Sequence, residues 1–267
     1  KQHTHSAQDF SELLFTENLE SIDTDLPGDY KMSVRDYYDE ISNGKQKIIG
    51  DVGSVVGWER ASNDYSYYVD GVNGTGTGED HGVSRSAAAL IVEIAMKMNN
   101  SGFEFTPFEN NQGVIDVVIL IVAGKGGDQE DNFFWPHMYI VPKAGYGLED
   151  IDIDEDEDPP SNSAGYFSPG SPNGVGIYKY IVIHEKYAWS PFIGDIHPIG
   201  TICHEIGHVL GLPDLYNTLD IDDPGIGRWG LMGSGNYNTQ TSPAYMSAWS
   251  RYRLGYIDPF IIENVTT

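Results

Sequence analysis

The segment His204-Glu205-Ile206-Gly207-His208 constrains this chain more than any other part of its sequence. In a helix, residues four positions apart lie on the same face, so the imidazoles of His204 and His208 can bind one metal ion together. Glu205 follows the first histidine and points off the metal axis, which suits it to act as general base on a zinc-bound water. The segment therefore predicts a helix that carries a zinc site.

The residues after this helix predict a third ligand. Gly211 allows the chain to leave the helix through a left-handed turn. That turn can bring Asp214 back to the metal as a ligand. Three protein ligands leave the fourth position of zinc open to water, which is the arrangement of catalytic rather than structural zinc sites.

A buried helix without metal is the alternative interpretation, in which the two histidines and the glutamate satisfy one another. A core-facing stripe is formed by Ile199, Ile202, Cys203, Ile206 and Leu210. The two interpretations are compatible, because a helix that carries a zinc site must itself be buried. Cys203 is the only cysteine, which excludes an intramolecular disulfide and suggests a small buried side chain rather than a nucleophile.

The charge balance limits the partners of the protein. The chain has 40 acidic and 15 basic side chains and a net charge of −25, which argues against nucleic acid or an anionic membrane as a partner. It fits a secreted protein that binds structural calcium through carboxylates, although solubility or adaptation to salt explains the same composition. The alternating acidic run 149–158 resembles a calcium loop, but it lacks the Gly and the closing Glu of an EF-hand, so a solvated loop is the alternative.

The hydrophobic pattern predicts an α/β (α+β) fold. Helices are expected at 6–19, 34–41, 85–98 and 244–254, a central strand covered on both faces at 114–123, a further strand at 180–184, and a strand or hairpin at 47–58. Ser33 is expected to cap the second helix together with Asp36. We expect a twisted mixed sheet over the zinc helix, in one catalytic domain spanning 1–267. A subdomain of sheet and helices with long loops would span about 1–196. The zinc helix, a turn holding Met232 and a C-terminal helix would span about 197–267.

These motifs resemble the metzincin metalloproteases that use Asp as third ligand, and most closely the immune inhibitor A family of secreted bacterial metallopeptidases. The similarity runs from about Ser33 to Tyr256. It is carried by the zinc helix and by Ser33–Tyr38, Trp135–His137, Gly211–Tyr216, Gly225–Met232 and Ser247–Ser250.

The resemblance implies a secreted, extracellular zinc endopeptidase that acts on proteins or peptides. His204, His208 and Asp214 would be the zinc ligands and Glu205 the catalytic base, with Met232 as the floor of the site. It also implies a removed propeptide, further C-terminal domains and, often, calcium. Tyr237 stands where some metzincins have a tyrosine that switches onto the metal or stabilises the oxyanion; a packed surface tyrosine is the alternative.

Some features depart from the family pattern. The chain opens Lys-Gln-His-Thr-His without a signal peptide or the strand that usually precedes the first helix, so we expect a processed or truncated form. Gly233 follows Met232 where Ala is more usual, which should matter little. Other functions that the sequence leaves open are a catalytically silent zinc- or calcium-binding adhesion module, a hydrolase of small amides or esters, and a carbohydrate-binding surface.

Overall fold

The computed structural model describes residues 3–24, 26–27, 30–71, 73–75, 85–126, 133–141, 166–167, 175–188, 195–220, 222–239 and 241–260 of the 267-residue chain. The chain divides into two compact units. One comprises Lys1–Thr4 and Trp58–His197, and we call it the sheet unit. The other comprises His5–Gly57 and Pro198–Thr267, and we call it the helical unit.

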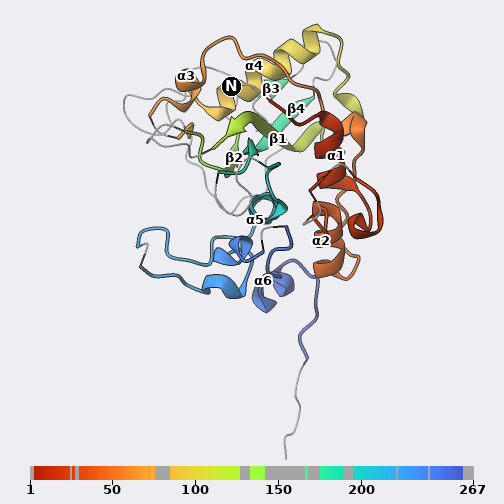
Figure 1. The fold of residues 1–267 in the computed structure, drawn as a ribbon, viewed down its shortest axis with the longest axis vertical. Helices are drawn as coiled ribbons and strands as arrows, with labels where there is room; N and C mark the ends of the chain where they lie inside the picture. Colours follow the sequence, from red (N-terminus) through yellow and green to blue (C-terminus); the bar gives the residue numbers. More distant parts are fainter. Residues whose placement is uncertain are drawn as a thin grey trace, which may run out of the picture. The chain divides into compact units, whose positions relative to one another are not determined.

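A mixed four-stranded sheet is the centre of the sheet unit (Figure 1). Its strands are β1 (Val114–Lys125), β2 (His137–Ile140), β3 (Tyr166–Phe167) and β4 (Gly176–Lys186). β4 pairs in parallel with β1 and antiparallel with β2 and β3, and Ile119 of β1 lies opposite Ile181 of β4. β4 has partners on both edges, and its side chains are more deeply buried than those of β1 and β2.

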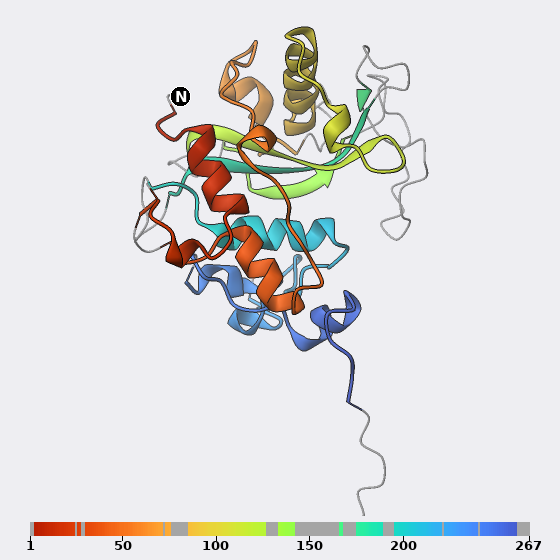
Figure 2. The ribbon, with the colours of Figure 1, turned by 90° about the vertical axis from the view of Figure 1, so that its right-hand side faces the viewer.

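Helices α3 (Tyr65–Val69) and α4 (Ala87–Asn100) lie together on one face of this sheet (Figure 2). Ser86 caps α4, because its hydroxyl accepts a hydrogen bond from the amide of Ala89. The apolar face of α4 packs with the strands into one hydrophobic core, which includes Tyr68, Leu90, Ile91, Tyr180 and Val182.

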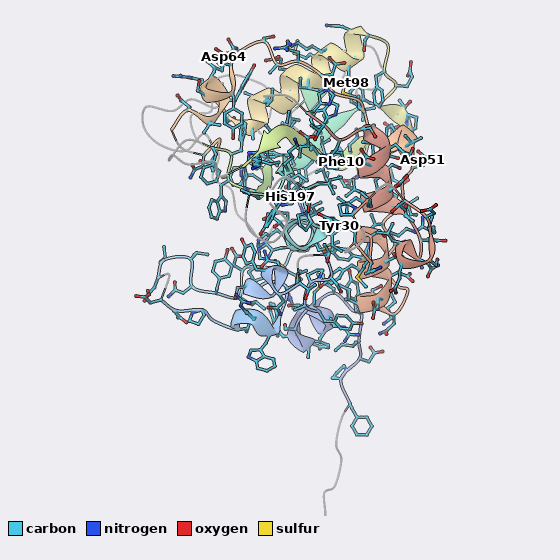
Figure 3. All side chains as sticks on the ribbon, viewed as in Figure 1. Phe10, Tyr30, Asp51, Asp64, Met98 and His197 are labelled. Atoms are coloured by element: carbon cyan, nitrogen blue, oxygen red, sulfur yellow. The ribbon has the colours of Figure 1, made fainter. Side chains whose placement is uncertain are left out.

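The helical unit contains α1 (Ala7–Phe15), α2 (Val34–Ser42), α5 (Ile199–Val209) and α6 (Ala248–Arg253), with 3-10 turns at Leu19–Ser21, Val52–Ser54, Gly227–Trp229 and Ser234–Tyr237. Capping boxes begin both α1 and α2, formed by Ser6 with Asp9 and by Ser33 with Asp36. Phe10 and Tyr30, labelled in Figure 3, belong to the buried core of this unit.

Burial rather than capping stabilises α5. Its N-cap is Pro198, which makes no side-chain capping hydrogen bond. Ile199, Ile202 and Cys203 are fully buried, and the apolar face they form is the stripe that the sequence predicts. No helix within the described ranges is long and apolar enough to cross a membrane.

Most predicted helices are confirmed, although their ends differ. The mixed α/β class and the helices at α1, α2, α4 and α5 agree with the sequence; α4 begins after Ser86, and α6 is shorter than predicted. The strand or hairpin at 47–58 is wrong, because this segment has only a 3-10 turn at Val52–Ser54. The strands predicted at 114–123 and 180–184 are confirmed as parts of β1 and β4. The central place predicted for the first is wrong, since β4 and not β1 has neighbours on both edges among the described strands.

The two-unit division differs from the subdivision expected at about residue 196. Residues 5–57 group with 198–267, whereas the sequence placed them with the sheet. The reason is that the apolar faces of α1 and α2 pack within the helical unit, α2 against α5. One catalytic domain over 1–267 with the metzincin arrangement of sheet and zinc helix stays a prediction.

Replacement of Ser33 by Ala should lower the free energy of unfolding by about 2 kcal/mol. The hydroxyl of Ser33 accepts from the amide of Asp36 at 3.0 Å and donates to the carbonyl of Thr16 at 2.6 Å, so both a cap and a buried hydrogen bond are lost. Ser6→Ala is the matched control, because it removes a capping box of the same type at an exposed position and should cost about 1 kcal/mol or less. Urea unfolding measures both, and equal losses would contradict the role of the Thr16 hydrogen bond.

His197 should make the protein less stable as the pH falls from about 6.5 to about 4. Burial lowers the pKa of this side chain in the folded protein to about 4, whereas it is 6.5 in the unfolded chain, so the unfolded chain takes up the proton first. The stabilisation is complete above pH 6.5 and declines by up to about 3 kcal/mol across this window. Chemical unfolding at several pH values measures the slope, and His197→Gln should flatten it; identical slopes would contradict the assignment.

Candidate metal centre

The turn after α5 brings Asp214 back to the two histidines of the helix. α5 ends in a Schellman motif, in which the amide of Leu212 donates to the carbonyl of Gly207 at 3.0 Å and the amide of Gly211 to that of His208 at 2.9 Å. Gly211 has φ of +88°, which is in the left-handed region that glycine tolerates best. The predicted turn is therefore confirmed as a backbone conformation.

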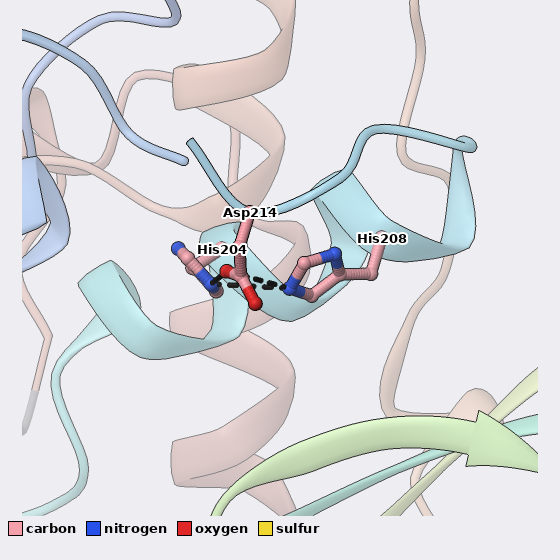
Figure 4. Close-up of side chains that lie close together, drawn as sticks. All are labelled: His204, His208 and Asp214. Atoms are coloured by element: carbon pink, nitrogen blue, oxygen red, sulfur yellow. Dashed lines mark hydrogen bonds and ion pairs between the residues drawn. The ribbon is translucent and has the colours of Figure 1, made fainter. Parts of the chain in front are cut away.

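Side-chain atoms of His204 and His208 on α5 and of Asp214 after it converge at one point (Figure 4). Nε2 of His204 lies 3.1 Å from Oδ1 of Asp214 and 3.2 Å from Nε2 of His208. Nε2 of His208 lies 3.3 Å from the same Oδ1. Within the described ranges, these are the residues whose His, Cys, Asp or Glu ligand atoms gather closely enough to hold a metal ion.

Backbone carbonyls determine which nitrogen of each imidazole faces the others. Nδ1 of His204 lies 2.9 Å from the carbonyl oxygen of Leu231, and Nδ1 of His208 lies 2.8 Å from that of Leu212. Because a carbonyl oxygen only accepts, each Nδ1 carries the hydrogen, which leaves Nε2 of each ring as the nitrogen that a metal ion can bind. Two nitrogen lone pairs and a carboxylate at such short distances repel one another unless a cation, either a proton on Nε2 or a metal ion, lies between them.

The donor set fits a tetrahedral zinc ion. With zinc bonds of about 2.0–2.1 Å, ligand atoms of a tetrahedron are ~3.3 Å apart, which agrees with the 3.1–3.3 Å measured here. Two imidazoles and one carboxylate also match the ligand types of catalytic zinc sites. Histidine ligands of zinc usually donate the hydrogen of their other ring nitrogen to an outer partner, and backbone carbonyls take that place here.

The electrostatics of the cluster favour a bound cation. Burial raises the pKa of the Asp214 carboxyl, but hydrogen bonds to His204 and His208 outweigh burial and hold this pKa well below its usual range. Burial lowers the pKa of His208, whereas the hydrogen bond to Asp214 and the charges of Glu205 and Asp214 raise it overall. Cys203 is fully buried as predicted, and burial raises the pKa of its thiol, so it stays protonated.

Met232 packs against α5 at Gly207. It is fully buried, and a Cβ atom added to Gly207 would lie 2.4 Å from its sulfur atom. A side chain at Gly207 would therefore have to displace the sulfur of Met232. Glycine is required at position 233, since a Cβ there would lie 2.3 Å from the carbonyl oxygen of Gly227. The expectation that this glycine matters little is wrong, because a backbone atom and not a movable side chain occupies the space.

Glu205 lies on α5 directly after His204 and is 6% exposed. Its negative charge contributes to the raised pKa of His208 and to that of Tyr237. A carboxylate next to the cluster can accept a proton there. This placement agrees with the position expected of a general base, whose role stays a proposal.

Two tyrosines lie near the cluster. Burial raises the pKa of Tyr237, a hydrogen bond with Asn236 opposes this, and the charges of Glu205 and Asp214 add to it; its side chain is 45% exposed. The ring of Tyr216 stacks near that of His204, with centroids 6.5 Å apart. Burial and Asp214 together raise the pKa of Tyr216. In the sequence, Tyr216 is marked only by its place two residues after Asp214, within a segment that carries the family resemblance.

The acidic run 149–158, which resembles a calcium loop, lies outside the described residues. Structural calcium thus stays a prediction.

A family model and several individual proteins match this chain in sequence. The family model described as the catalytic domain of immune inhibitor A peptidase M6 matches residues 1–258. The pre-pro-metalloprotease PrtV of Vibrio cholerae serotype O1 (strain M66-2) is 26% identical over 282 residues, which cover 94% of this chain and 27% of PrtV. Immune inhibitor A of Bacillus thuringiensis subsp. alesti is 24% identical over 224 residues, which cover 76% of this chain and 28% of that protein. The chain thus spans about a quarter of the length of these curated relatives.

Replacement of Gly211 by Ala should lower the free energy of unfolding by about 1–2 kcal/mol. A Cβ atom at Gly211 meets no other atom within 4 Å, so the cost is that of holding an alanine at φ of +88°. Gly57→Ala is the matched control, because its Cβ also has open space and its φ is ordinary; it should change stability by less than about 0.5 kcal/mol. Thermal unfolding of the metal-free proteins compares the two. Equal effects would contradict the requirement for a left-handed residue after α5.

Proposed function

This chain belongs to the immune inhibitor A peptidase M6 family, and from that premise we propose that it is a zinc-dependent endopeptidase that hydrolyses peptide bonds in protein substrates. The observation that carries the proposal is the convergence of His204, His208 and Asp214, whose donor atoms lie 3.1–3.3 Å apart. In this proposal all three are zinc ligands, and the fourth position of the metal stays open.

The bound zinc ion would polarise the scissile carbonyl and lower the pKa of its water towards ~7. The chain's own residues supply the remaining functions. His204 and His208 would bind the metal through Nε2, because their Nδ1 hydrogens are held by the carbonyls of Leu231 and Leu212. Asp214 adds one negative charge, which offsets part of the charge of the ion.

Glu205 is the proposed general base. It would take a proton from the attacking water and deliver it to the nitrogen of the leaving amine, so that one carboxylate serves both halves of the reaction. Its support is its position beside His204 on α5 and its electrostatic influence on His208. Burial to 6% exposure limits competing hydration of this carboxylate.

Secretion by a bacterium is also part of the proposal. Its support is the description of the Vibrio cholerae relative as a pre-pro-metalloprotease and the secreted nature implied by the family resemblance. The relatives are several times longer than this chain, which supports additional domains in the full-length protein. A removed propeptide and structural calcium remain parts of the proposal that rest on the resemblance alone.

The first test is metal content by mass spectrometry on protein purified without added metal, paired with casein cleavage before and after a chelator. The proposal predicts about one zinc per chain, activity lost on chelation, and activity restored by zinc. Uptake of zinc without casein cleavage would favour the silent binding module, and cleavage of small amides alone would favour the small-substrate hydrolase. Absence of zinc after its addition would contradict the assignment of the three ligands.

Replacement of Glu205 by Ala should leave zinc content unchanged and reduce kcat on casein by about a thousandfold, because the proton acceptor is lost while the three ligands remain. His208→Ala is the contrasting variant, since it should lose both the metal and the activity. Zinc content and initial rates, measured on the same preparations, separate the two roles. Near-normal turnover by the Glu205 variant would rule out this residue as the base.

A further inference from the structure

Two adjacent tyrosines on α2 make hydrogen bonds into the framework of the metal centre. Tyr37 and Tyr38 are both fully buried, and their rings pack edge to face with centroids 5.4 Å apart. The hydroxyl of Tyr38 donates to the carbonyl of Cys203 at 2.7 Å, and that of Tyr37 donates to the carbonyl of Ala244 at 2.8 Å. Because successive helical side chains point in different directions, the pair contacts two separate segments of the helical unit.

The Tyr38 hydrogen bond acts on the main chain of the first proposed ligand. Cys203 directly precedes His204 in the middle of α5. A carbonyl inside a helix already accepts from the amide four residues later, so the phenol is an additional donor from another element. α5 has no side-chain N-cap, and it contains Gly200 and Gly207, so its own sequence fixes its position weakly. A buried directional contact at Cys203 therefore limits rotation and sliding of the helix.

The Tyr37 hydrogen bond acts on the ring of the same ligand through the backbone. The hydroxyl of Tyr37 donates to the carbonyl of Ala244. The carbonyl of the next residue, Tyr245, accepts from the amide of Leu231 at 3.1 Å. The carbonyl of Leu231 in turn accepts from Nδ1 of His204 at 2.9 Å. Tyr37 thus supports the peptide segment that orients this imidazole.

We propose that Tyr37 and Tyr38 are positioning residues for His204, one fixing the segment that orients its ring and the other fixing its main chain. The inference rests on the proposed zinc site, because its purpose is to hold Nε2 of His204 in place for the metal. Packing alone does not account for the pair, since phenylalanine would fill the same space without either hydrogen bond. Burial raises the pKa of both phenols well above the usual value, so both remain donors at any physiological pH.

The test replaces each tyrosine by phenylalanine, which keeps the ring and removes one hydroxyl. Tyr256→Phe is the matched control, because Tyr256 is a buried tyrosine of the same unit whose hydroxyl donates to Gln46 at 3.3 Å and not toward His204. Three quantities are measured for each protein: the zinc dissociation constant by chelator competition, the visible spectrum of the cobalt-substituted protein, and the thermal midpoint of the metal-free protein.

Tyr38→Phe should weaken zinc binding roughly tenfold and Tyr37→Phe several-fold, each with an altered cobalt spectrum, as for other residues that orient a ligand indirectly. Tyr256→Phe should lower the thermal midpoint while zinc affinity and spectrum stay at wild-type values. The inference is overturned if zinc affinity and spectrum are unchanged in both tyrosine variants, or if the control weakens binding equally. If the wild-type protein binds no zinc, the proposed function itself fails. The Tyr37 variant keeps the test decisive should Tyr38→Phe not fold.

Discussion

Two hydrogen bonds from imidazole nitrogens to backbone carbonyls determine what the cluster at the end of α5 can do. Nδ1 of His204 is held by Leu231 and Nδ1 of His208 by Leu212. With these hydrogens fixed, both Nε2 atoms point at the carboxylate of Asp214. Loss of either carbonyl would leave a ring free to rotate or to change tautomer, and the set of three donors would no longer be ready for a metal ion.

The two carbonyls come from different parts of the helical unit, and the backbone around each is tightly constrained. Leu212 belongs to the Schellman motif that Gly211 makes possible through its positive φ. Leu231 directly precedes Met232, whose sulfur occupies the space that a side chain at Gly207 would need. Local turn geometry thus orients one ligand, and long-range packing orients the other.

The sequence predicts the local half of this arrangement and misses the rest for a physical reason. The spacing of His204, His208 and Asp214 and the capping box at Ser33 depend on residues within a few turns of one another, so a single segment contains the signal. The carbonyl of Leu231 and the phenol of Tyr38 reach α5 from 27 and 165 residues away, and no sequence pattern encodes such contacts. The segment 47–58 was misjudged similarly. Its β-branched residues favour a strand, but Gly50 lies against the ring of Phe15, and residues 47–57 belong to the helical unit without joining a sheet.

The central claim is that these three side chains bind one metal ion with an open position. X-ray absorption at the zinc K-edge of the loaded protein tests it most directly, because it reports the ligand atoms without depending on activity. The account predicts a first shell of nitrogen and oxygen at about 2.0–2.1 Å with the multiple scattering of two imidazoles. A sulfur shell at about 2.3 Å, or scattering from fewer than two imidazoles, would contradict it.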